Sequence, residues 1–232
     1  LEFGAKRLEF GAEREEFGVS RRRVRDAFVR VAFGVRRLGH LPADLRVLDG
    51  LASLEHLILN IFPWNSVDDG LLQALKAIPN LRTLQLVQCD HIRTLESFLE
   101  LRKLPSLQNL ELENCSALSH LIDLTSMTNI HSLKMMHCSR LKDLDGLQIP
   151  NNLTALDISS WPMILDKQQS LSNLQAMTHL KSLKLREMND LKRLNGIESM
   201  TELQVLHLNK CHRLLPGKIL STLVNLKELY LT

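Results

Sequence analysis

A single six-residue pattern, apolar-x-x-apolar-x-apolar, recurs along most of this chain and limits what it can fold into. The first copy is LEHLIL, starting at Leu54. Seven more copies begin at Leu81, Leu107, Ile130, Leu153, Leu180, Leu203 and Leu226. A unit this short cannot bury its apolar face alone, so consecutive copies must stack on one another. The pattern therefore predicts an elongated stack of equivalent units.

Each copy predicts one short strand, because the residues of its x-L-x-L segment point alternately to opposite faces. Between the copies, apolar residues recur at every third position, as in Ile92, Leu95, Phe98, Leu101, Leu104 and Leu107. A period of three fits 3₁₀ turns or extended segments better than an α-helix. We therefore expect an α/β fold, a leucine-rich-repeat solenoid of about eight repeats. A parallel β-sheet should form its concave side, and the convex side should be mostly 3₁₀ or irregular.

The first 40 residues differ from the repeats. LEFGAKR, LEFGAER and EEFGVSR form a seven-residue tandem, followed by an Arg-rich stretch. We expect residues 1–40 to be a low-complexity Arg/Phe/Gly-rich segment, disordered or loosely packed. Residues 41–232 form the repeat domain, which we expect to be a C-terminally truncated fragment, because its eighth strand has no polar cap. An alternative for the first segment is a degenerate capping strand at 28–33, since Phe28, Val31 and Phe33 lie 26 residues before Leu54, Leu57 and Leu59.

The positive charge of the chain is concentrated in its first segment. Residues 1–40 hold 10 Lys/Arg against 6 Asp/Glu, whereas residues 41–232 hold 19 against 20. The repeat domain is therefore close to neutral and lacks the basic footprint that nucleic-acid binding requires. No apolar run reaches the length of a membrane span, and no basic-then-apolar leader precedes a cleavage site. We expect an intracellular, cytoplasmic protein that binds neither nucleic acid nor membrane.

The four cysteines occupy one recurring slot, eight positions after the first apolar residue of a repeat. This slot holds Cys89, Cys115, Cys138 and Cys211, and in other repeats Phe62, Trp161 and Met188. A slot shared with plain hydrophobic residues is predicted to lie in the core, with the thiols reduced. The sequence contains no close cysteine pair for zinc, no phosphate-binding loop and no catalytic motif. We predict no metal, no cofactor, no small-molecule substrate and no enzyme activity.

A binding surface is expected on the concave face, where one outward residue of each strand lies beside the next. The middle outward position reads Ile58, Gln85, Glu111, Lys134, Asp157, Lys184, His207 and Tyr230. The following outward position reads Asn60, Val87, Glu113, Met136, Ser159, Arg186 and Asn209. Our candidate protein-binding residues are Gln85, Glu111, Glu113, Lys134, Met136, Asp157, Lys184, Arg186 and His207. Both charges with a methionine among them fit a protein epitope better than a polyanion, and the alternative is a merely solvated face.

The consensus L-x-x-L-x-L-x-x-C-x-x-L-x-x-L is displayed by LQNLELENCSALSHL at 107–121 and by LQVLHLNKCHRLL at 203–215. Over roughly residues 45–232 the chain resembles the repeat region of plant intracellular immune receptors of the nucleotide-binding leucine-rich-repeat type. The resemblance implies a role in plant defence. Its partner would be a pathogen effector, a host protein or an adjacent domain of the same receptor. No nucleotide-binding module is present, so no nucleotide role is assigned to any residue.

Other protein classes use the same repeat. One alternative is the substrate-recruiting repeat region of an F-box-type ubiquitin ligase, and another is an intracellular leucine-rich-repeat scaffold. An extracellular receptor is a further alternative, which glycosylation of the sequons at Asn114 or Asn152 would support. All of these alternatives share protein binding and differ in the neighbouring domains that they require.

Overall fold

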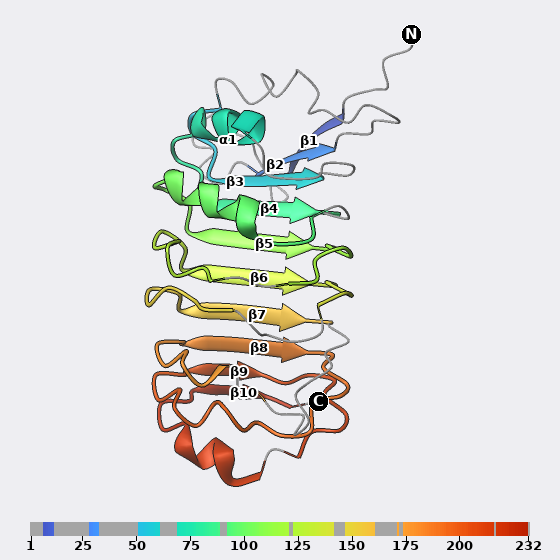
Figure 1. Ribbon diagram of the computed structural model, residues 1–232, viewed down its shortest axis with the longest axis vertical. Helices are drawn as coiled ribbons and strands as arrows, with labels where there is room; N and C mark the ends of the chain where they lie inside the picture. The colour runs from blue at the N-terminus through green and yellow to red at the C-terminus, as the bar shows by residue number, and fades with distance from the viewer. Residues whose placement is uncertain are drawn as a thin grey trace, which may run out of the picture.

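The structure is a computed structural model and describes residues 7–11, 28–32, 51–60, 69–88, 92–120, 123–141, 147–160, 171, 174–215 and 217–231. In this part of the chain, strands β1 to β10 form one sheet in chain order (Figure 1). The strands are β1 (Arg7–Gly11), β2 (Phe28–Ala32), β3 (His56–Asn60), β4 (Thr83–Val87), β5 (Asn109–Glu113), β6 (Ser132–Met136), β7 (Ala155–Ser159), β8 (Ser182–Arg186), β9 (Val205–His207) and β10 (Glu228–Tyr230). The connections contain the α-helix α1 (Asp69–Lys76) and the 3₁₀ helices η2 (Glu96–Lys103) and η4 (Gly217–Thr222).

Strands β3 to β10 are parallel and correspond one to one to the predicted repeats. Equivalent residues face each other across neighbouring strands, as Leu84, Leu110 and Leu133 do. The inward leucines are almost fully buried, and both Leu84 and Leu86 on β4 are 0% exposed. These strands therefore send alternate side chains into one continuous apolar core. The predicted leucine-rich-repeat solenoid is confirmed.

The return segments on the convex side follow the predicted period of three. Leu104 donates its backbone N–H to the carbonyl oxygen of Leu101 at 3.0 Å, and Leu107 donates to Leu104 at 3.1 Å. The same step, at 3.0 to 3.2 Å, joins Leu194, Ile197, Met200 and Leu203. Each turn brings another apolar side chain back to the core, so a return segment needs no long helix. The expected, mostly irregular convex side with few helices is confirmed.

Strands β4 to β8 are each followed directly by a residue in the left-handed backbone region, and Lys210 holds the same repeat position after β9. These residues are Gln88 (φ 61°), Asn114 (56°), His137 (55°), Ser160 (58°), Glu187 (61°) and Lys210 (57°). The conformation costs a non-glycine residue about 1–2 kcal/mol. Hydrogen bonds to the next repeat offset this cost. The Asn114 N–H donates to the Met136 carbonyl at 3.0 Å, and the Glu187 N–H donates to that of Asn209 at 2.9 Å.

The slot after these turns belongs to the core. Cys115 is 1% exposed, Cys138 0% and Cys211 7%, and Met188 in the same slot is 1% exposed. Each thiol also contacts a carbonyl oxygen near the end of a strand. The Cys138 Sγ lies 3.6 Å from that of Met136, for example. The core-slot prediction is confirmed for these three cysteines, and Cys89 lies outside the described residues.

Two strands from the first 40 residues join the sheet at its N-terminal end. β2 pairs in parallel with β3, and β1 pairs antiparallel with β2. A capping strand near 28–33 is therefore present, but its register differs from the predicted one. Val31 lies opposite Leu59 rather than Leu57, and Val29 takes the position opposite Leu57. A slip of two residues leaves the same alternate residues on each face, so the hydrophobic pattern does not distinguish the two registers.

Most of residues 1–50 lie outside the described residues, including Phe33 of the proposed capping strand. The expectation that residues 1–40 are disordered or loosely packed therefore concerns mostly residues outside the described part of the chain. That expectation and the domain boundary between residues 40 and 41 stay predictions.

The C-terminal end of the solenoid exposes apolar side chains. On β10, Leu229 is 40% exposed, although its partner Leu206 on β9 is 0% exposed. Leu231 is 48% exposed and Val224 76%. No further strand among the described residues pairs with the outer edge of β10. The last apolar layer is therefore open to solvent on one side.

Candidate functional site

The outward side chains of the strands lie in rows across the concave face, because the parallel strands are in register. The middle row runs Gln85, Glu111, Lys134, Asp157, Lys184, His207 and Tyr230. The end row, two residues further along each strand, runs Val87, Glu113, Met136, Ser159 and Arg186. All nine predicted candidates stand in these two rows. Their positions are thus brought onto one face, while their role in binding stays a prediction.

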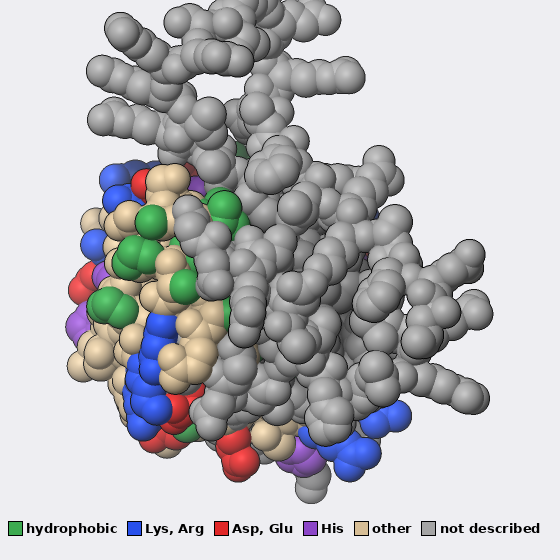
Figure 2. Space-filling model, turned by 90° about the horizontal axis from the view of Figure 1, so that it is seen from above, with side chains coloured by type: hydrophobic (Ala, Val, Ile, Leu, Met, Phe, Trp, Pro, Cys, Tyr) green, Lys and Arg blue, Asp and Glu red, His purple; other side chains and the backbone are tan. Residues whose placement is uncertain are grey.

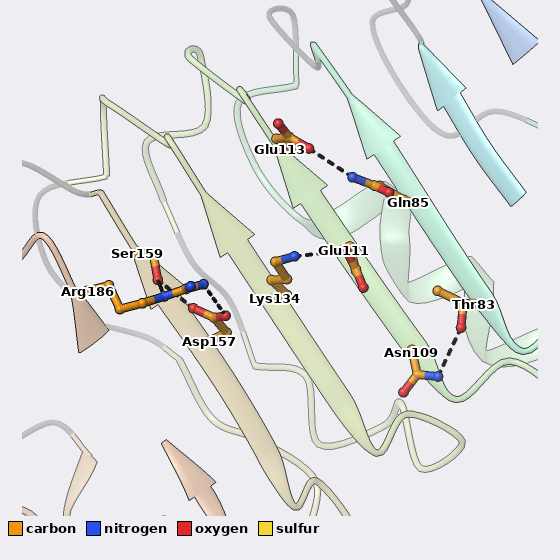
Figure 3. A network of polar contacts seen from close by, with 9 residues as sticks. All are labelled: Thr83, Gln85, Asn109, Glu111, Glu113, Lys134, Asp157, Ser159 and Arg186. Atoms are coloured by element: carbon orange, nitrogen blue, oxygen red, sulfur yellow. Dashed lines mark hydrogen bonds and ion pairs between the residues drawn. The ribbon is translucent and has the colours of Figure 1, made fainter. Parts of the chain in front are cut away.

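Polar contacts join neighbouring strands near β5 (Figure 3). The Gln85 Nε2 donates to the Glu113 Oε2 at 2.8 Å, and the Lys134 Nζ lies 3.2 Å from the Glu111 Oε2. All four side chains are half-buried. Lys134 neutralises Glu111, whereas Gln85 offers Glu113 only a neutral amide. Glu113 therefore keeps its charge unmatched by any cation among the described residues.

A denser cluster lies on β7 and β8. The Arg186 Nη2 lies 2.9 Å from the Asp157 Oδ2, and its Nε donates to the Ser159 Oγ at 3.3 Å (Figure 3). The Ser159 hydroxyl donates in turn to the Asp157 carboxylate. As a result Ser159 is only 3% exposed, and the Asp157 side chain is 13% exposed. Much of the binding capacity of the Arg186 guanidinium is thus used inside the protein.

Ser159 was not among the predicted candidates, although it stands in the end row with three of them. Its outward position suggested a solvated side chain, and the structure instead buries it beneath Arg186. A serine aligned between an aspartate and an arginine on adjacent strands is the signal that could have revealed this cluster. The sequence gives the alignment of these three residues but not the choice of contacts.

Lys184 differs from Arg186 in its contacts. It lies between Asp157 and His207 in the middle row. No carboxylate among the described residues lies within ion-pair distance of it, because the adjacent Asp157 pairs with Arg186. Its ammonium group is therefore the cation of the two rows that is open to a partner.

His207 and Tyr230 form an aromatic pair at the C-terminal end of the middle row. Their ring centroids are 4.1 Å apart and the ring planes are tilted by 50°. Burial lowers the pKa of His207, and the positive charges of Lys184 and Arg186 lower it further. Both effects favour the neutral form of the imidazole. Tyr230 is 46% exposed and offers aromatic surface of the kind that anchors protein interfaces.

A second polar line flanks the face and is formed by the left-handed residues after the strands. Glu187 accepts a hydrogen bond from the Ser160 Oγ at 2.6 Å and one from the Lys210 Nζ at 2.7 Å. The hydrogen bonds from Lys210 and Ser160 lower the pKa of Glu187 to about 2. Sequence reasoning did not identify this line. The signal was a polar residue directly before the cysteine slot in the repeats from Leu81 onward.

The described interior offers little to a metal ion or a small ligand. No three His, Cys, Asp or Glu side chains of the described ranges are grouped to hold a metal ion. A cavity of about 10 Å³ between repeats is lined only by apolar side chains, among them Leu110, Leu133 and Leu153. Such a cavity holds one water molecule at most and has no polar group to orient a ligand.

Within the described part of the chain, no helix is long and apolar enough to cross a bilayer. In the coloured, described part of Figure 2, Lys/Arg, Asp/Glu and hydrophobic side chains lie in small separate groups. A mixed surface of this kind differs from the field of one sign that a polyanion requires.

Solved structures that are similar to this chain are found among known proteins. The leucine-rich-repeat domain of the type III effector XopL matches with a TM-score of 0.51 and 19% identity, over 82% of this chain and 72% of that chain. The plant peptide hormone receptor RGFR1, solved in complex with RGF2, matches with a TM-score of 0.39 and 16% identity, over 94% of this chain and 37% of that chain. The Toll–Spatzle complex of Drosophila gives a TM-score of 0.37 and 17% identity, over 84% of this chain and 35% of that chain.

No family model matches the sequence, and no match is found among curated proteins. The likeness to the XopL domain agrees with the leucine-rich-repeat fold that the strand register shows independently. At 19% identity this likeness concerns the fold alone. A function is therefore inferred from the residues of the concave face.

Proposed function

We propose that this chain is a protein-recognition module and that its concave face, from β4 to β9, is the binding surface. The observation that carries this proposal is the register of the middle and end rows, in which the nine candidate residues lie side by side on one face. The face combines both charges with Met136 at its centre, as protein interfaces do. A nucleic-acid site would instead concentrate positive charge. We expect neither enzyme activity nor a cofactor or small-molecule substrate.

At a finer level, the module acts as the sensing and autoinhibitory repeat region of a plant intracellular immune receptor, in the cytoplasm. The support is the consensus at 107–121, whose described apolar positions lie inside the solenoid. Leu107, Leu110, Leu112, Cys115 and Leu118 are all buried. The partner is then a pathogen effector, a host protein or an adjacent domain of the same receptor.

Affinity capture from plant cells tests the binding surface. The bait is this chain, compared with its Met136→Arg and Lys192→Glu variants. Met136 lies at the centre of the end row, whereas Lys192 is exposed on the return segment after β8. A partner that the original chain retains should be lost with Met136→Arg and kept with Lys192→Glu. A partner that both variants keep would place the binding surface elsewhere.

The sequence of the transcript upstream of Leu1 and downstream of Thr232 tests the receptor proposal. A module with the phosphate loop G-x-x-x-x-G-K-[ST] upstream is the expected result. A short helical adaptor-binding module in its place would favour the F-box-type ubiquitin ligase. If neither module is present, the immune-switch mechanism fails for this product, and a binding scaffold without it remains.

A further inference from the structure

The concave face carries equal numbers of positive and negative side chains, but not every one of them lies beside an opposite charge. The middle and end rows hold three carboxylates and three cations, namely Glu111, Glu113, Asp157, Lys134, Lys184 and Arg186. Lys134 neutralises Glu111 across 3.2 Å. Arg186 neutralises Asp157 across 2.9 Å. Of these six charges, Glu113 on β5 and Lys184 on β8 are therefore left without an ion partner among the described residues.

Both unmatched charges are partly withdrawn from water, because both side chains are half-buried. Glu113 is held toward β4 by the Gln85 amide at 2.8 Å, which fixes its position without neutralising it (Figure 3). The positive charge of Lys184 acts on the neighbouring His207, because it contributes to lowering the pKa of that imidazole. A half-buried charge gains more from an opposite charge than a fully exposed one, because water screens it less.

The geometry of the sheet fixes the spacing between the two charges. β5 and β8 are three strand steps apart, which is about 14 Å at the usual spacing of strands. Lys184 also lies two residues earlier along its strand than the position aligned with Glu113, so the diagonal separation is roughly 16 Å. An extended chain covers this distance in about five residues. Met136, beside Glu113 in the end row, offers apolar surface between the two charges.

We propose that the concave face binds an extended segment of a partner protein with one basic and one acidic side chain. The basic side chain lies opposite Glu113, the acidic one opposite Lys184, and about four or five residues separate them. An apolar side chain between them covers Met136. This inference rests on the proposed function, because it requires that the concave face is the protein-binding surface.

Selection from a random twelve-residue peptide display library on the immobilised chain tests the proposal without a known partner. The expected peptides carry one Lys or Arg and one Asp or Glu, four or five residues apart, with an apolar residue between them. An enriched peptide is then synthesised, and its dissociation constant is measured by fluorescence polarisation. Because the two charges are fixed on the face, the peptide should bind in one orientation.

Single charge reversals locate each contact. Glu113→Lys and Lys184→Glu should each weaken the selected peptide by about tenfold or more. The peptide whose basic residue is changed to Glu should then bind Glu113→Lys more tightly than it binds the original chain. Selection on Lys184→Glu should yield peptides with two basic residues. These changes in peptide preference are expected only if the side chains at positions 113 and 184 contact the peptide directly.

Matched controls change the same charges elsewhere. Lys192→Glu alters net charge as Lys184→Glu does, and Glu96→Lys on η2 matches Glu113→Lys. Both controls should change the dissociation constant less than about twofold, because distant charges are screened. Circular dichroism melts check that all four variants remain folded.

Three outcomes separate the inference from the function on which it rests. Enriched peptides that carry the charge pair and respond to both reversals support the inference. Peptides that ignore the reversals at Glu113 and Lys184 but are lost with Met136→Arg overturn the inference and leave the concave face as the binding surface. If no peptide is enriched, or if the enriched peptides still bind the Met136→Arg variant, both the inference and the proposed use of this face are overturned.

Discussion

Arg186 reaches from β8 to β7 and places its Nη2 2.9 Å from the carboxylate of Asp157, above the buried hydroxyl of Ser159. Lys184, two residues earlier on β8, makes no ion pair with any described residue. The sequence presents these two cations as one basic pair, but the structure gives them different roles. Arg186 holds the face together, while Lys184 is available to a partner.

The two cations should therefore differ in their effect on stability. Arg186→Ala leaves the Asp157 carboxylate, whose side chain is 13% exposed, without its cation. We expect the free energy of unfolding to fall by about 1–3 kcal/mol. Lys184→Ala should change it by less than about 0.5 kcal/mol. Urea unfolding followed by circular dichroism measures both, and equal losses would contradict the separate roles.

The left-handed turns after the strands make a second test of stability. Gln88 has a φ of 61° and an exposed side chain, so Gln88→Gly removes backbone strain without removing a buried contact. We expect a gain of about 0.5 kcal/mol, whereas the β-branched Gln88→Val should cost about 1–2 kcal/mol. Gln108 is an exposed glutamine without a positive φ, and Gln108→Gly should be destabilising. A loss of stability in Gln88→Gly would show that the turn stores no strain.

The solenoid could be predicted because one physical constraint repeats in every unit. Leu84, Leu110 and Leu133 have to point inward, and because they hold the same position in successive repeats, they lie opposite one another from β4 to β6. The same reasoning placed all nine candidate residues in two rows. Alternation sets which face a residue occupies, and equal repeat phase sets its neighbours.

Pair contacts on the face could not be predicted in the same way. Asp157 has cations on the adjacent strand at both Lys184 and Arg186, and the choice between them depends on side-chain geometry. The burial of Ser159 follows from that choice. The register of β2 escaped prediction for another reason, because a two-residue slip preserves the hydrophobic alternation. Sequence therefore determines the face, whereas the charges that remain unmatched emerge only from the structure.

The cysteine slot gives a chemical test of the core. Cys115 and Cys138 are 1% and 0% exposed, so thiol reagents can reach them only when the solenoid opens. We expect labelling of both in the native protein to be at least about a hundredfold slower than in urea-unfolded protein. Cys211 should also react slowly, since burial raises the pKa of its thiol. Fast native labelling, or a disulfide between Cys115 and Cys138, would contradict the core-slot assignment.

His207 gives a pH dependence whose direction follows from its surroundings. The groups that act on its charge are Lys184 and Arg186, which disfavour protonation, and Glu228 and Asp157, which favour it less strongly than burial and the cations oppose it. The pKa of folded His207 therefore lies below the ordinary histidine value of 6.5. In the pH range between the two pKa values, the unfolded chain binds more protons than the folded chain. Stability from this group is thus present above pH 6.5 and is lost as the pH falls toward the folded pKa.

Unfolding in urea at pH 7.5, 6.5 and 5.5 measures this loss. His207→Gln should lose less stability over this range than the original chain, because its side chain takes up no proton. Lys184→Ala should act in the same direction, since removing the ammonium group raises the pKa of folded His207 toward its ordinary value. The matched Lys192→Ala change, on the return segment after β8, should leave the pH dependence as it is. An unaltered pH dependence in both His207→Gln and Lys184→Ala would show that the cations of the concave face do not control this imidazole.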